Sequence, residues 1–330
     1  MSEERFLVTG GTGCIGSWVI RNLVLEGIST HVLDHGGSKH RLEMILSEED
    51  LARVNFIPGD ISDLAAVENA LRRSQASNMI HLAALQMPAC RADPSLGAQV
   101  NVVGTINAFE ACKRIGIDKI AYSSSTAVYG PKHMYSDGPL RHDVPLYPTT
   151  HYGVYKQANE ASARIYWDDD GLSSVGLRPY TVYGPGRDQG MTSSPTKAMI
   201  AAVIRRPYQI TFGGRYGFEY ADDVAKIFIK AARASYQGAH VFSIGGRPTH
   251  TEEIITAIES VEPSMRDKIS YIDSPLPFPE EFDDAAIVSL LGEVPRTPLI
   301  DGIASTISIY QQEISNGRLN FDWLESVLGA

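Results

Sequence analysis

A strand that runs directly into a glycine-rich turn is the feature that most constrains this chain of 330 residues. The apolar run Arg5–Thr9 is followed by Gly10-Gly11-Thr12-Gly13-Cys14-Ile15-Gly16, which opens a helical pattern. Glycine is needed where a strand reverses tightly into a helix and the backbone must approach a pyrophosphate, which the helix N-terminus then binds. The pattern predicts a dinucleotide site formed by Gly10, Gly13, Cys14, Ile15 and Gly16.

Short apolar runs alternate with longer helical patterns through the first half of the chain. Further strands are expected at residues 31–33, 54–57, 78–82, 119–122, 174–178 and 240–244. This alternation predicts an α/β fold of the Rossmann type, a doubly wound parallel sheet with helices on both faces, and a smaller C-terminal α/β substrate lobe. We expect the dinucleotide-binding domain at 1–175 plus about 218–246, and the substrate-binding lobe at about 176–217 and 247–330.

Asp34 stands at the end of the second predicted strand, where a carboxylate can accept hydrogen bonds from the adenosine ribose hydroxyls. Its negative charge should repel a 2′-phosphate, which favours NAD over NADP. Lys39 and Arg41 follow in a polar loop and leave a phosphate-binding alternative open.

Asp60 and Ile61 end another predicted strand and are expected to border the adenine. Asp60 or Ser62 could instead act as a helix N-cap, because Asp and Ser are favoured there. The two interpretations do not exclude each other.

Tyr152 and Lys156 form a second motif, Tyr-x-x-x-Lys, downstream of the serine run Ser123-Ser124-Ser125. On a helix, side chains four residues apart lie on one face, one turn apart. A free tyrosine has a pKa of about 10, and a neighbouring ammonium group favours the phenolate. We expect Tyr152 to take the proton of an alcohol while hydride leaves to the cofactor, with a serine hydroxyl orienting the same oxygen. The alternative is an ordinary surface helix, but the preceding serine run favours catalysis.

Together these motifs resemble those of the extended short-chain dehydrogenase/reductases, the NAD-dependent epimerase/dehydratase family. The resemblance covers nearly the whole chain and is carried by segments 9–16, 81–84, 101–105, 123–130, 152–156, 177–179 and 182–186. It implies a bound NAD, a sheet of about seven strands and a C-terminal substrate lobe. It also implies a homodimer formed through the helices around 99–114 and 151–167.

Matched motif by motif, the resemblance assigns roles to single residues. Ser125, Tyr152 and Lys156 fall at catalytic positions, and Asn101 falls at the asparagine that supports the active-site helix. Beside the glycine turn, the implied cofactor contacts are Asp34, Asp60, Ile61, Leu82, Ala83, Ala84, Asn101, Tyr152 and Lys156. Thr126 and Arg187 are candidate substrate residues, and no metal site is expected.

Members of this family epimerise, dehydrate, decarboxylate or oxidise their substrates. Dehydratases carry an Asp-Glu pair after the catalytic Thr, where this chain has Thr126-Ala127, so dehydration is not expected. Sugar-nucleotide members clamp the diphosphate with two arginines, neither of which stands at the matching positions here. We therefore expect an NAD-dependent oxidoreductase that oxidises a secondary alcohol of a small sugar or sugar-acid-like substrate, with Tyr as the base.

Residues 183–191, followed by Thr196-Lys197-Ala198, are nevertheless similar to a segment of UDP-glucuronate 4-epimerases. Arg187 in that segment could face a carboxylate or a phosphate, or it could be a surface charge. The alternative function is therefore a nucleotide-sugar 4-epimerase for a UDP-hexose or UDP-hexuronate, with tightly bound NAD. A remote alternative is a non-catalytic dinucleotide sensor, although such proteins tend to lack the Tyr/Lys pair.

Composition limits the remaining classes of function. The formal net charge is −10, so an extended nucleic-acid surface is not expected. Cys14, Cys90 and Cys112 are widely spaced, which argues against a disulfide framework or a zinc cluster. Apolar runs of about 18 residues and a signal peptide are both missing, so we expect no membrane span and a cytoplasmic location.

Overall fold

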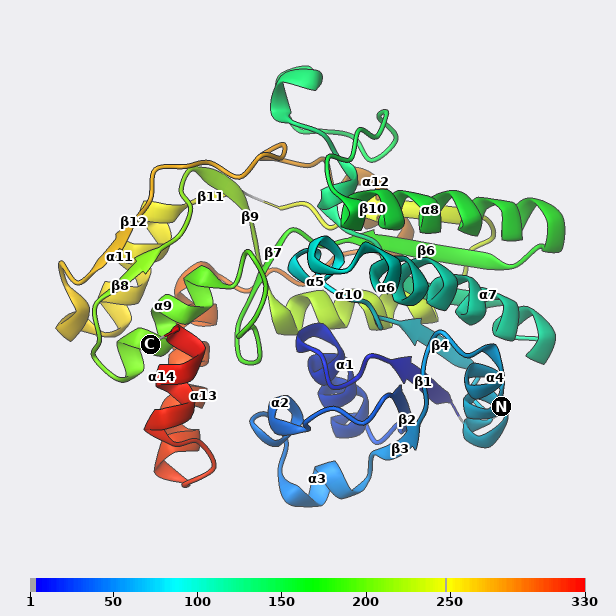
Figure 1. The fold of residues 1–330 in the computed structure, drawn as a ribbon, viewed down its shortest axis with the longest axis horizontal. Coiled ribbons are helices and arrows are strands. Elements are labelled where there is room, and N and C mark those ends of the chain that lie inside the picture. Colours follow the sequence, from blue (N-terminus) through cyan, green and yellow to red (C-terminus); the bar gives the residue numbers. More distant parts are fainter. Residues whose placement is uncertain (1–3, 247, 330) are drawn as a thin grey trace.

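The computed structural model describes residues 4–246 and 248–329, and a seven-stranded parallel sheet forms its larger part (Figure 1). The strands are β1 (Arg5–Thr9), β2 (Ser29–Asp34), β3 (Asn55–Pro58), β4 (Asn78–His81), β5 (Lys119–Ser123), β6 (Ser173–Arg178) and β10 (Ala239–Ser243). Their order is β10-β6-β5-β4-β1-β2-β3, and every neighbouring pair is parallel. The predicted doubly wound sheet is confirmed.

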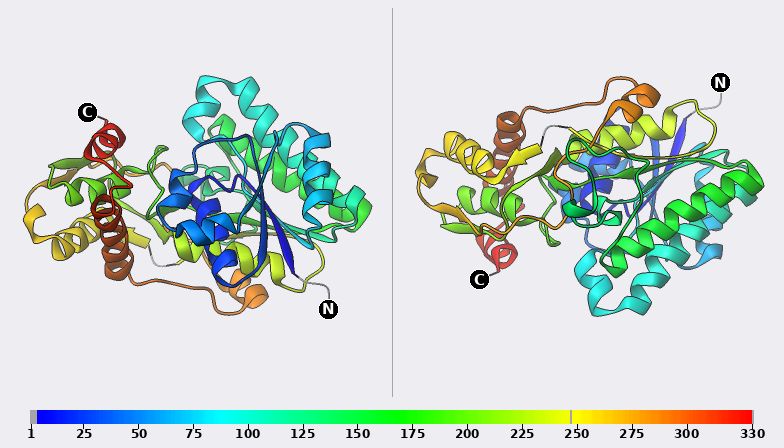
Figure 2. Two further views of the ribbon diagram at one scale, coloured as in Figure 1. Left: turned by 90° about the horizontal axis from the view of Figure 1, so that it is seen from below. Right: turned by 90° about the horizontal axis from the view of Figure 1, so that it is seen from above.

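Helices cover both faces of this sheet, as the two views in Figure 2 show. On one face lie α1 (Cys14–Leu25) and α10 (Ala221–Arg233), and on the other α4 (Leu64–Ser74), α7 (Gly104–Ile115) and α8 (His151–Asp170). The shorter helical segments of this part are α2 (His40–Glu43), α3 (Glu48–Ala52), α5 (Met87–Ala92), α6 (Pro94–Ala98), the π-helical turn η1 (Gln99–Val103) and the 3₁₀ turns η2 (Thr126–Val128) and η3 (Lys132–Met134). Within residues 4–246 and 248–329, no helix combines the length and apolarity needed to cross a bilayer.

The first strand shows why this sequence forms a two-sided sheet. Phe6 and Val8 pack into the core beside α1 and α10, whereas Leu7 packs into the core beside α4 and α7, and all three are fully buried. A strand buried on both faces needs a continuous apolar run, which β1 supplies. The strand order changes direction between β1 and β4, so the connections there diverge and leave a crevice above the carboxyl ends.

The C-terminal half adds a smaller α/β part beyond the carboxyl ends of the strands, as expected. It contains a sheet of β7 (Thr181–Tyr183), β9 (Arg215–Tyr220) and β11 (Pro248–His250), and the strand pair β8 (Tyr208–Ile210) and β12 (Ile269–Tyr271). The remaining helices are α9 (Ser194–Val203), α11 (Thr251–Val261), α12 (Ala285–Leu291), α13 (Leu299–Ser315), α14 (Phe321–Leu328) and the 3₁₀ turn η4 (Pro263–Met265).

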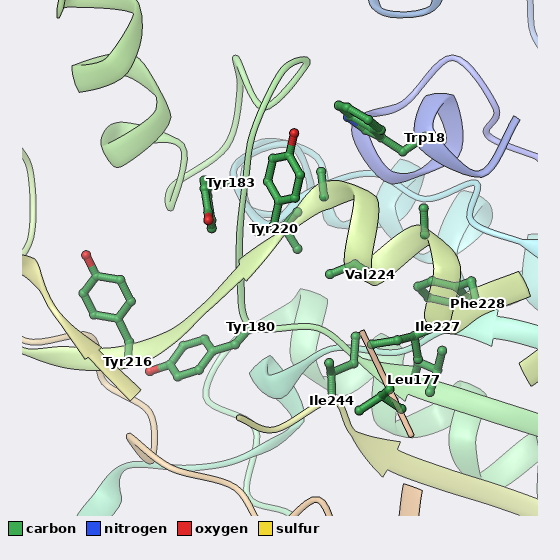
Figure 3. Packing of buried hydrophobic residues seen from close by; sticks show 14 of the residues in the cluster. Trp18, Leu177, Tyr180, Tyr183, Tyr216, Tyr220, Val224, Ile227, Phe228 and Ile244 are labelled. Carbon is green, nitrogen blue, oxygen red and sulfur yellow. The ribbon is translucent and has the colours of Figure 1, made fainter. Parts of the chain in front are cut away.

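A single apolar core joins the smaller part to the large sheet. The rings of Tyr183 in β7 and Phe218 in β9 are stacked, with centroids 3.9 Å apart. Tyr220 continues this aromatic layer toward Val224 and Phe228 of α10, which pack against the sheet (Figure 3). The two parts therefore share buried surface rather than meeting through a polar linker.

The structure bears on the expected domain division at two points. The boundary between residues 175 and 176 falls inside β6, which pairs along its whole length in the large sheet up to Arg178. The segment at about 218–246 begins within β9, which pairs with β7 and β11, and only its later elements, α10 and β10, belong to the large sheet and its helices. The division at 1–175 plus about 218–246 stays a prediction.

Candidate active site

Two adjoining cavities open at the carboxyl edge of the large sheet, above the ends of β1 and β4. The wide cavity, of about 930 Å³, is bounded by the segments that follow β2 and β3. The narrow cavity, of about 210 Å³, is bounded by the serine run, the start of α8 and Phe278. Both cavities reach the glycine turn, so a ligand in one can contact a ligand in the other.

Nearly all the predicted site residues line these cavities. The wide cavity has Asp34, Asp60, Ile61 and Ala83; the narrow cavity has Ile15, Gly16, Ser125, Thr126, Tyr152 and Lys156; both have Gly10, Gly13, Cys14, Leu82, Ala84 and Arg187. Asn101 lines neither cavity. The structure thus brings together residues that are up to 177 positions apart in the sequence (Gly10 to Arg187).

The glycine turn is compact because side chains would not fit. A Cβ on Gly16 would lie 2.3 Å from the carbonyl oxygen of Gly10, and a Cβ on Gly10 would lie 2.7 Å from the backbone of Ala83. Gly10 also has a φ of +68°, which L side chains rarely adopt. The start of α1 therefore presents bare backbone to the cavities, and this cradle fits the pyrophosphate of a dinucleotide.

The acidic residues of the wide cavity are held in place by short hydrogen bonds. Asp34 accepts from the Thr12 hydroxyl at 2.8 Å and from the Thr12 backbone N–H at 3.3 Å. Asp60 accepts from the backbone and hydroxyl of Ser62, both at 2.8 Å, which lowers the pKa of Asp60. The N-cap of the following helix is Asp63, so the alternative N-cap role for Asp60 or Ser62 was wrong.

The cations near Asp34 already have partners. The Arg41 guanidinium binds Asp188 at 2.6 Å, the Gly186 carbonyl at 2.9 Å and the Thr12 carbonyl at 3.2 Å. The Lys39 ammonium lies 3.7 Å from the centre of the Phe56 ring. Neither cation is placed to hold a 2′-phosphate without giving up these contacts, which favours the expected NAD over NADP.

Helix α8 carries the Tyr-x-x-x-Lys motif and lies very close to the serine run. The Thr150 hydroxyl caps its N-terminus by accepting from the Gly153 N–H at 3.1 Å. A Cβ on Gly153 would lie only 2.1 Å from the carbonyl oxygen of Ala127, so only glycine allows this approach. The first turn of α8, with Tyr152, is thereby held against the turn that carries Ser125.

One turn beyond Lys156, α8 is fastened to the sheet by a buried ion pair. Arg178 at the end of β6 donates to both carboxylate oxygens of Glu160, at 2.8 and 2.7 Å, and the Ser124 hydroxyl donates to the same carboxylate. The side chains of Arg178 and Glu160 are 4% and 7% exposed. Tyr152, Lys156 and Glu160 are spaced four residues apart, so they lie on the same face of α8. The Arg178–Glu160 ion pair therefore determines that this face is turned toward the narrow cavity.

The Ser125 side chain lies beside the Tyr152 phenol in the narrow cavity and favours the ionised form of that phenol. Burial raises the pKa of Tyr152, and the Ser125 side chain and the positive charge of Arg187 offset only part of this effect. The expectation that Lys156 lowers this pKa is corrected here. The Lys156 ammonium lies 5.7 Å from the centre of the Tyr152 ring and donates to the Ser123 carbonyl at 2.7 Å instead.

Lys156 is 3% exposed, and this burial lowers its pKa from 10.5 to about 8. Glu160, one turn further along α8, acts in the opposite direction and favours the charged form. The site therefore contains a tyrosine that is harder to ionise than usual and a lysine that gives up its proton more readily than usual.

Asn101 is fully buried behind the site and does not contact the cavities, which corrects its assignment as a cofactor contact. Its amide clasps the loop after β4, accepting from the Leu85 N–H at 2.7 Å and donating to the Leu85 carbonyl at 2.9 Å. Its own carbonyl accepts from Asn159 of α8 at 2.9 Å. These bonds agree with a supporting role, and the π-helical turn η1 gives Asn101 this position.

His81 and Thr126 have structural partners. His81 is buried between the hydroxyls of Thr9 and Thr105, at 2.7 and 3.0 Å, and burial lowers its pKa to about 3. It is thus a neutral strand-end residue rather than a ligand. The Thr126 backbone N–H and hydroxyl both point to the Pro179 carbonyl, at 3.2 and 3.4 Å, while the residue still lines the narrow cavity.

The family model described as "NAD dependent epimerase/dehydratase family" matches residues 6–245, from the first strand to the end of the large sheet. The chain belongs to this family. It is an NAD-dependent enzyme of the short-chain dehydrogenase type, which confirms the predicted family and the predicted cofactor, NAD. The epimerase/dehydratase fold also accounts for the location of both cavities at the switch in strand order.

Relatives and solved structures of the epimerase/dehydratase family are similar over almost the whole chain. A UDP-glucose 4-epimerase of Mycolicibacterium smegmatis is 30% identical over 94% of this chain and 99% of its own. The structure of Thermus thermophilus UDP-glucose 4-epimerase with NAD is 25% identical, with a TM-score of 0.77 over 93% of this chain and 99% of that one. The structure of MoeE5 with UDP-glucuronic acid and NAD is 25% identical, with a TM-score of 0.76 over 94% and 99%.

Several residues of this epimerase/dehydratase site were not predicted from the sequence. They come from separate parts of the chain, namely the loop after β4, the start of α5, β7 and its two flanking loops, and the loop after β12: Gln86, Met87, Pro88, Tyr180, Val182, Met191, Thr192 and Phe278. For the residues that follow β4 and β6, the position at the carboxyl edge of the parallel sheet is a signal that could have indicated them. Val182 and Met191 lie within segments 182–186 and 183–191, which resemble those of the family. Among the described residues, no group of three or more His, Cys, Asp or Glu side chains is arranged to hold a metal ion.

Lys156→Met is expected to increase the free energy of unfolding at pH 7, because an apolar chain replaces a buried ammonium. The gain should be at most roughly 3 kcal/mol, at about 1.36 kcal/mol per unit for the pKa change from 10.5 to about 8. The folded wild-type protein releases this proton near pH 8 and the unfolded chain only near 10.5, so wild-type stability rises across that window. The difference in the free energy of unfolding between Lys156→Met and the wild-type protein should therefore become smaller as the pH rises from 8 to 10.5.

Urea unfolding of the NAD-free proteins at pH 7, 8.5 and 10 measures this difference. Lys132→Met, at an exposed lysine, is the control and should show no such pH dependence. A difference of equal size at all three pH values would contradict the assignment of the depressed pKa to Lys156.

Proposed function

We propose that this enzyme is an NAD-dependent 4-epimerase of a nucleotide-linked hexose or hexuronate. The observation that carries the proposal is the joint presence of the Ser125–Tyr152–Lys156 group beside the glycine turn and of full-length similarity to a UDP-glucose 4-epimerase. This differs from the net oxidation of a small free sugar that the sequence favoured. The change rests on the relatives, which match from end to end.

The residues of the narrow cavity divide the proposed chemistry among them. NAD, held by the glycine turn and the residues of the wide cavity, would supply the acceptor for the hydride on the sugar carbon that bears the hydroxyl, and its reduced form would be the donor that restores this hydride. Tyr152 accepts the hydroxyl proton, so that a secondary alcohol becomes a ketone, and gives the proton back when the ketone is reduced from the opposite face. Ser125 orients the same oxygen. Lys156 lies one turn further along α8, with its ammonium 5.7 Å from the centre of the Tyr152 ring. No net oxidation results.

Arg187 supports a substrate with an acidic group near the reacting carbon. Its guanidinium lines both cavities, its Nη2 donates to the Thr192 hydroxyl at 3.0 Å, and its buried Nε has no partner among the described residues. A buried donor without a partner is costly, and a carboxylate would satisfy it with a charge-assisted bond. We therefore propose a UDP-hexuronate as the preferred substrate, as in the ligand of MoeE5.

A second candidate function, oxidation of a free sugar or sugar acid, is favoured by one observation. In the described part of the chain, the cations that line the narrow cavity are Lys156 and Arg187, so the pair of arginines expected to clamp a diphosphate is absent there. A free sugar acid would use Arg187 in the same way. The two functions share the first half-reaction and differ in whether the ketone is reduced again.

Incubation with NAD and a panel of UDP-glucose, UDP-glucuronate, free hexoses and hexuronates distinguishes these functions. We expect a UDP-sugar to be converted into its 4-epimer without accumulation of NADH at 340 nm. Tyr152→Phe should reduce kcat by about 10²–10⁴-fold while NAD content is unchanged, because only the proton acceptor is removed. NADH formed from free sugars, with every UDP-sugar recovered unchanged, would favour the second candidate instead.

Arg187→Gln should reduce kcat/KM for UDP-glucuronate by at least about tenfold, because a charge-assisted bond to the carboxylate is lost. For UDP-glucose, which lacks this carboxylate, the change should be less than about threefold. Steady-state kinetics with both substrates measure the ratio of the two kcat/KM values. Arg141→Gln, at an exposed arginine, is the matched control and should leave this ratio unchanged. Equal losses for the two substrates would contradict the role of Arg187 as a carboxylate ligand.

We also propose that the enzyme is a homodimer formed through α7 and α8. Support comes from apolar side chains that these helices leave exposed: Ile106, Val154 and Ile165 are 37%, 47% and 50% exposed. Ile165→Arg should shift the mass in sedimentation equilibrium from two chains to one. Ile300→Arg, on α13 and 42% exposed, should leave the mass unchanged, and a wild-type protein with the mass of one chain would refute the dimer.

A further inference from the structure

A short segment of the C-terminal half lies along the wide cavity, between α2 on one side and the loop after β4 on the other. Residues 186–190, which follow β7 and which we call the strap, all line that cavity. At one end, a Cβ on Gly186 would lie 3.2 Å from the Arg41 side chain, and at the other end a Cβ on Gly190 would lie 2.0 Å from Gln86. Arg41 belongs to α2 and Gln86 to the loop after β4, so the strap spans the gap between them.

The strap is fastened to the α2 wall by a nearly buried carboxylate. Asp188, which is 5% exposed, accepts from Arg41 at 2.6 Å and is 3.0 Å from the His40 Nε2. Arg41 also donates to the strap backbone at the Gly186 carbonyl and to the glycine turn at the Thr12 carbonyl. One arginine thus connects the strap, α2 and the turn that cradles the pyrophosphate. We call Asp188, Arg41 and His40 the latch.

The base of the strap is fixed, and glycines stand at both of its ends. The Trp18 indole N–H of α1 donates to the Pro185 carbonyl at 3.0 Å, and the Gly186 N–H donates to the Tyr310 hydroxyl at 3.3 Å. Gly186 and Gly190 have φ values of +87° and +97°, which glycine adopts without strain. The backbone can therefore change direction at both ends of the strap while the segment before it stays anchored. Figure 1 shows this loop, which follows β7, extending toward α1 and α2.

We infer that the strap holds NAD in the wide cavity and that opening of the Asp188–Arg41–His40 latch limits the rate at which NAD leaves. A dinucleotide lying between the glycine turn and Asp34 is covered by the strap, and its release requires the strap to separate from α2. That movement breaks two contacts to a carboxylate that is almost excluded from water, and such charge-assisted contacts are strong. The cofactor therefore stays with the enzyme over many turnovers.

Retention of NAD suits a reaction in which hydride is returned to the same substrate. An enzyme that oxidises its substrate must exchange NADH for NAD in every cycle, so a latched cavity would slow it. The inference concerns NAD and the residues of this chain, and its test does not depend on which sugar is the substrate. Failure of the proposed epimerase activity would therefore leave the test of the latch intact.

The test measures NAD release directly. Wild-type protein and the variants Asp188→Asn and Arg41→Gln are loaded with radiolabelled NAD, passed through a desalting column and chased with unlabelled NAD. We expect the wild-type protein to keep its NAD through the column. Both variants should release NAD at least tenfold faster than the wild-type protein does, because each removes the ion pair while keeping a polar side chain.

Asp50→Asn is the matched control, because Asp50 forms an exposed Arg–Asp pair with Arg53 on the neighbouring helix α3 and does not touch the cavity. Its release rate should equal that of the wild-type protein. Circular dichroism verifies folding, and if Asp188→Asn does not fold, Arg41→Lys and His40→Gln carry the test with smaller increases. Folded latch variants that release NAD within twofold of the wild-type rate, or wild-type protein that loses NAD on the column, would overturn the inference.

Discussion

The buried ion pair between Glu160 and Arg178 is the interaction on which the geometry of this active site depends. It joins the middle of α8 to the end of β6, and Ser124 of the serine run donates to the same carboxylate. Two buried charges are tolerated only when they are paired in good geometry, so α8 cannot rotate or slide without exposing one of them to an apolar core. The orientation of Tyr152 and Lys156 follows from this requirement and from the contact of Gly153 with the serine turn.

Most of the fold could be predicted from the sequence because its signals are local. The apolar strand Arg5–Thr9, the glycine turn and the alternation of short and long segments each reflect a physical need of nearby residues, and all seven strands of the large sheet were expected. The same holds for Asp34, Tyr152 and Lys156, because their spacing from a strand end or along a helix already fixes where they lie.

The parts of the site that could not be predicted depend on contacts between residues that are far apart in the sequence. Phe278 reaches the narrow cavity from a proline-rich loop far along the chain, and Arg41 meets Asp188 across 147 positions. Asn101 matched a motif, but its burial behind the loop after β4 depends on the π-helical turn, which has no sequence signature here. The upward shift in the pKa of Tyr152 likewise arises from burial, which spacing along one helix does not indicate.

The apolar core that runs without interruption from the large sheet into the smaller part has a mechanical consequence. The ring of Trp18 in α1 packs against the ring of Tyr220 in β9, and the ring centroids of Tyr220 and Tyr183 are 5.4 Å apart. Bending of one part relative to the other would therefore separate these packed aromatic rings. The two halves should thus unfold as one cooperative unit and should not move relative to each other as hinged domains do. We therefore expect substrate and cofactor to enter through the movement of loops, while the two halves keep their relative position.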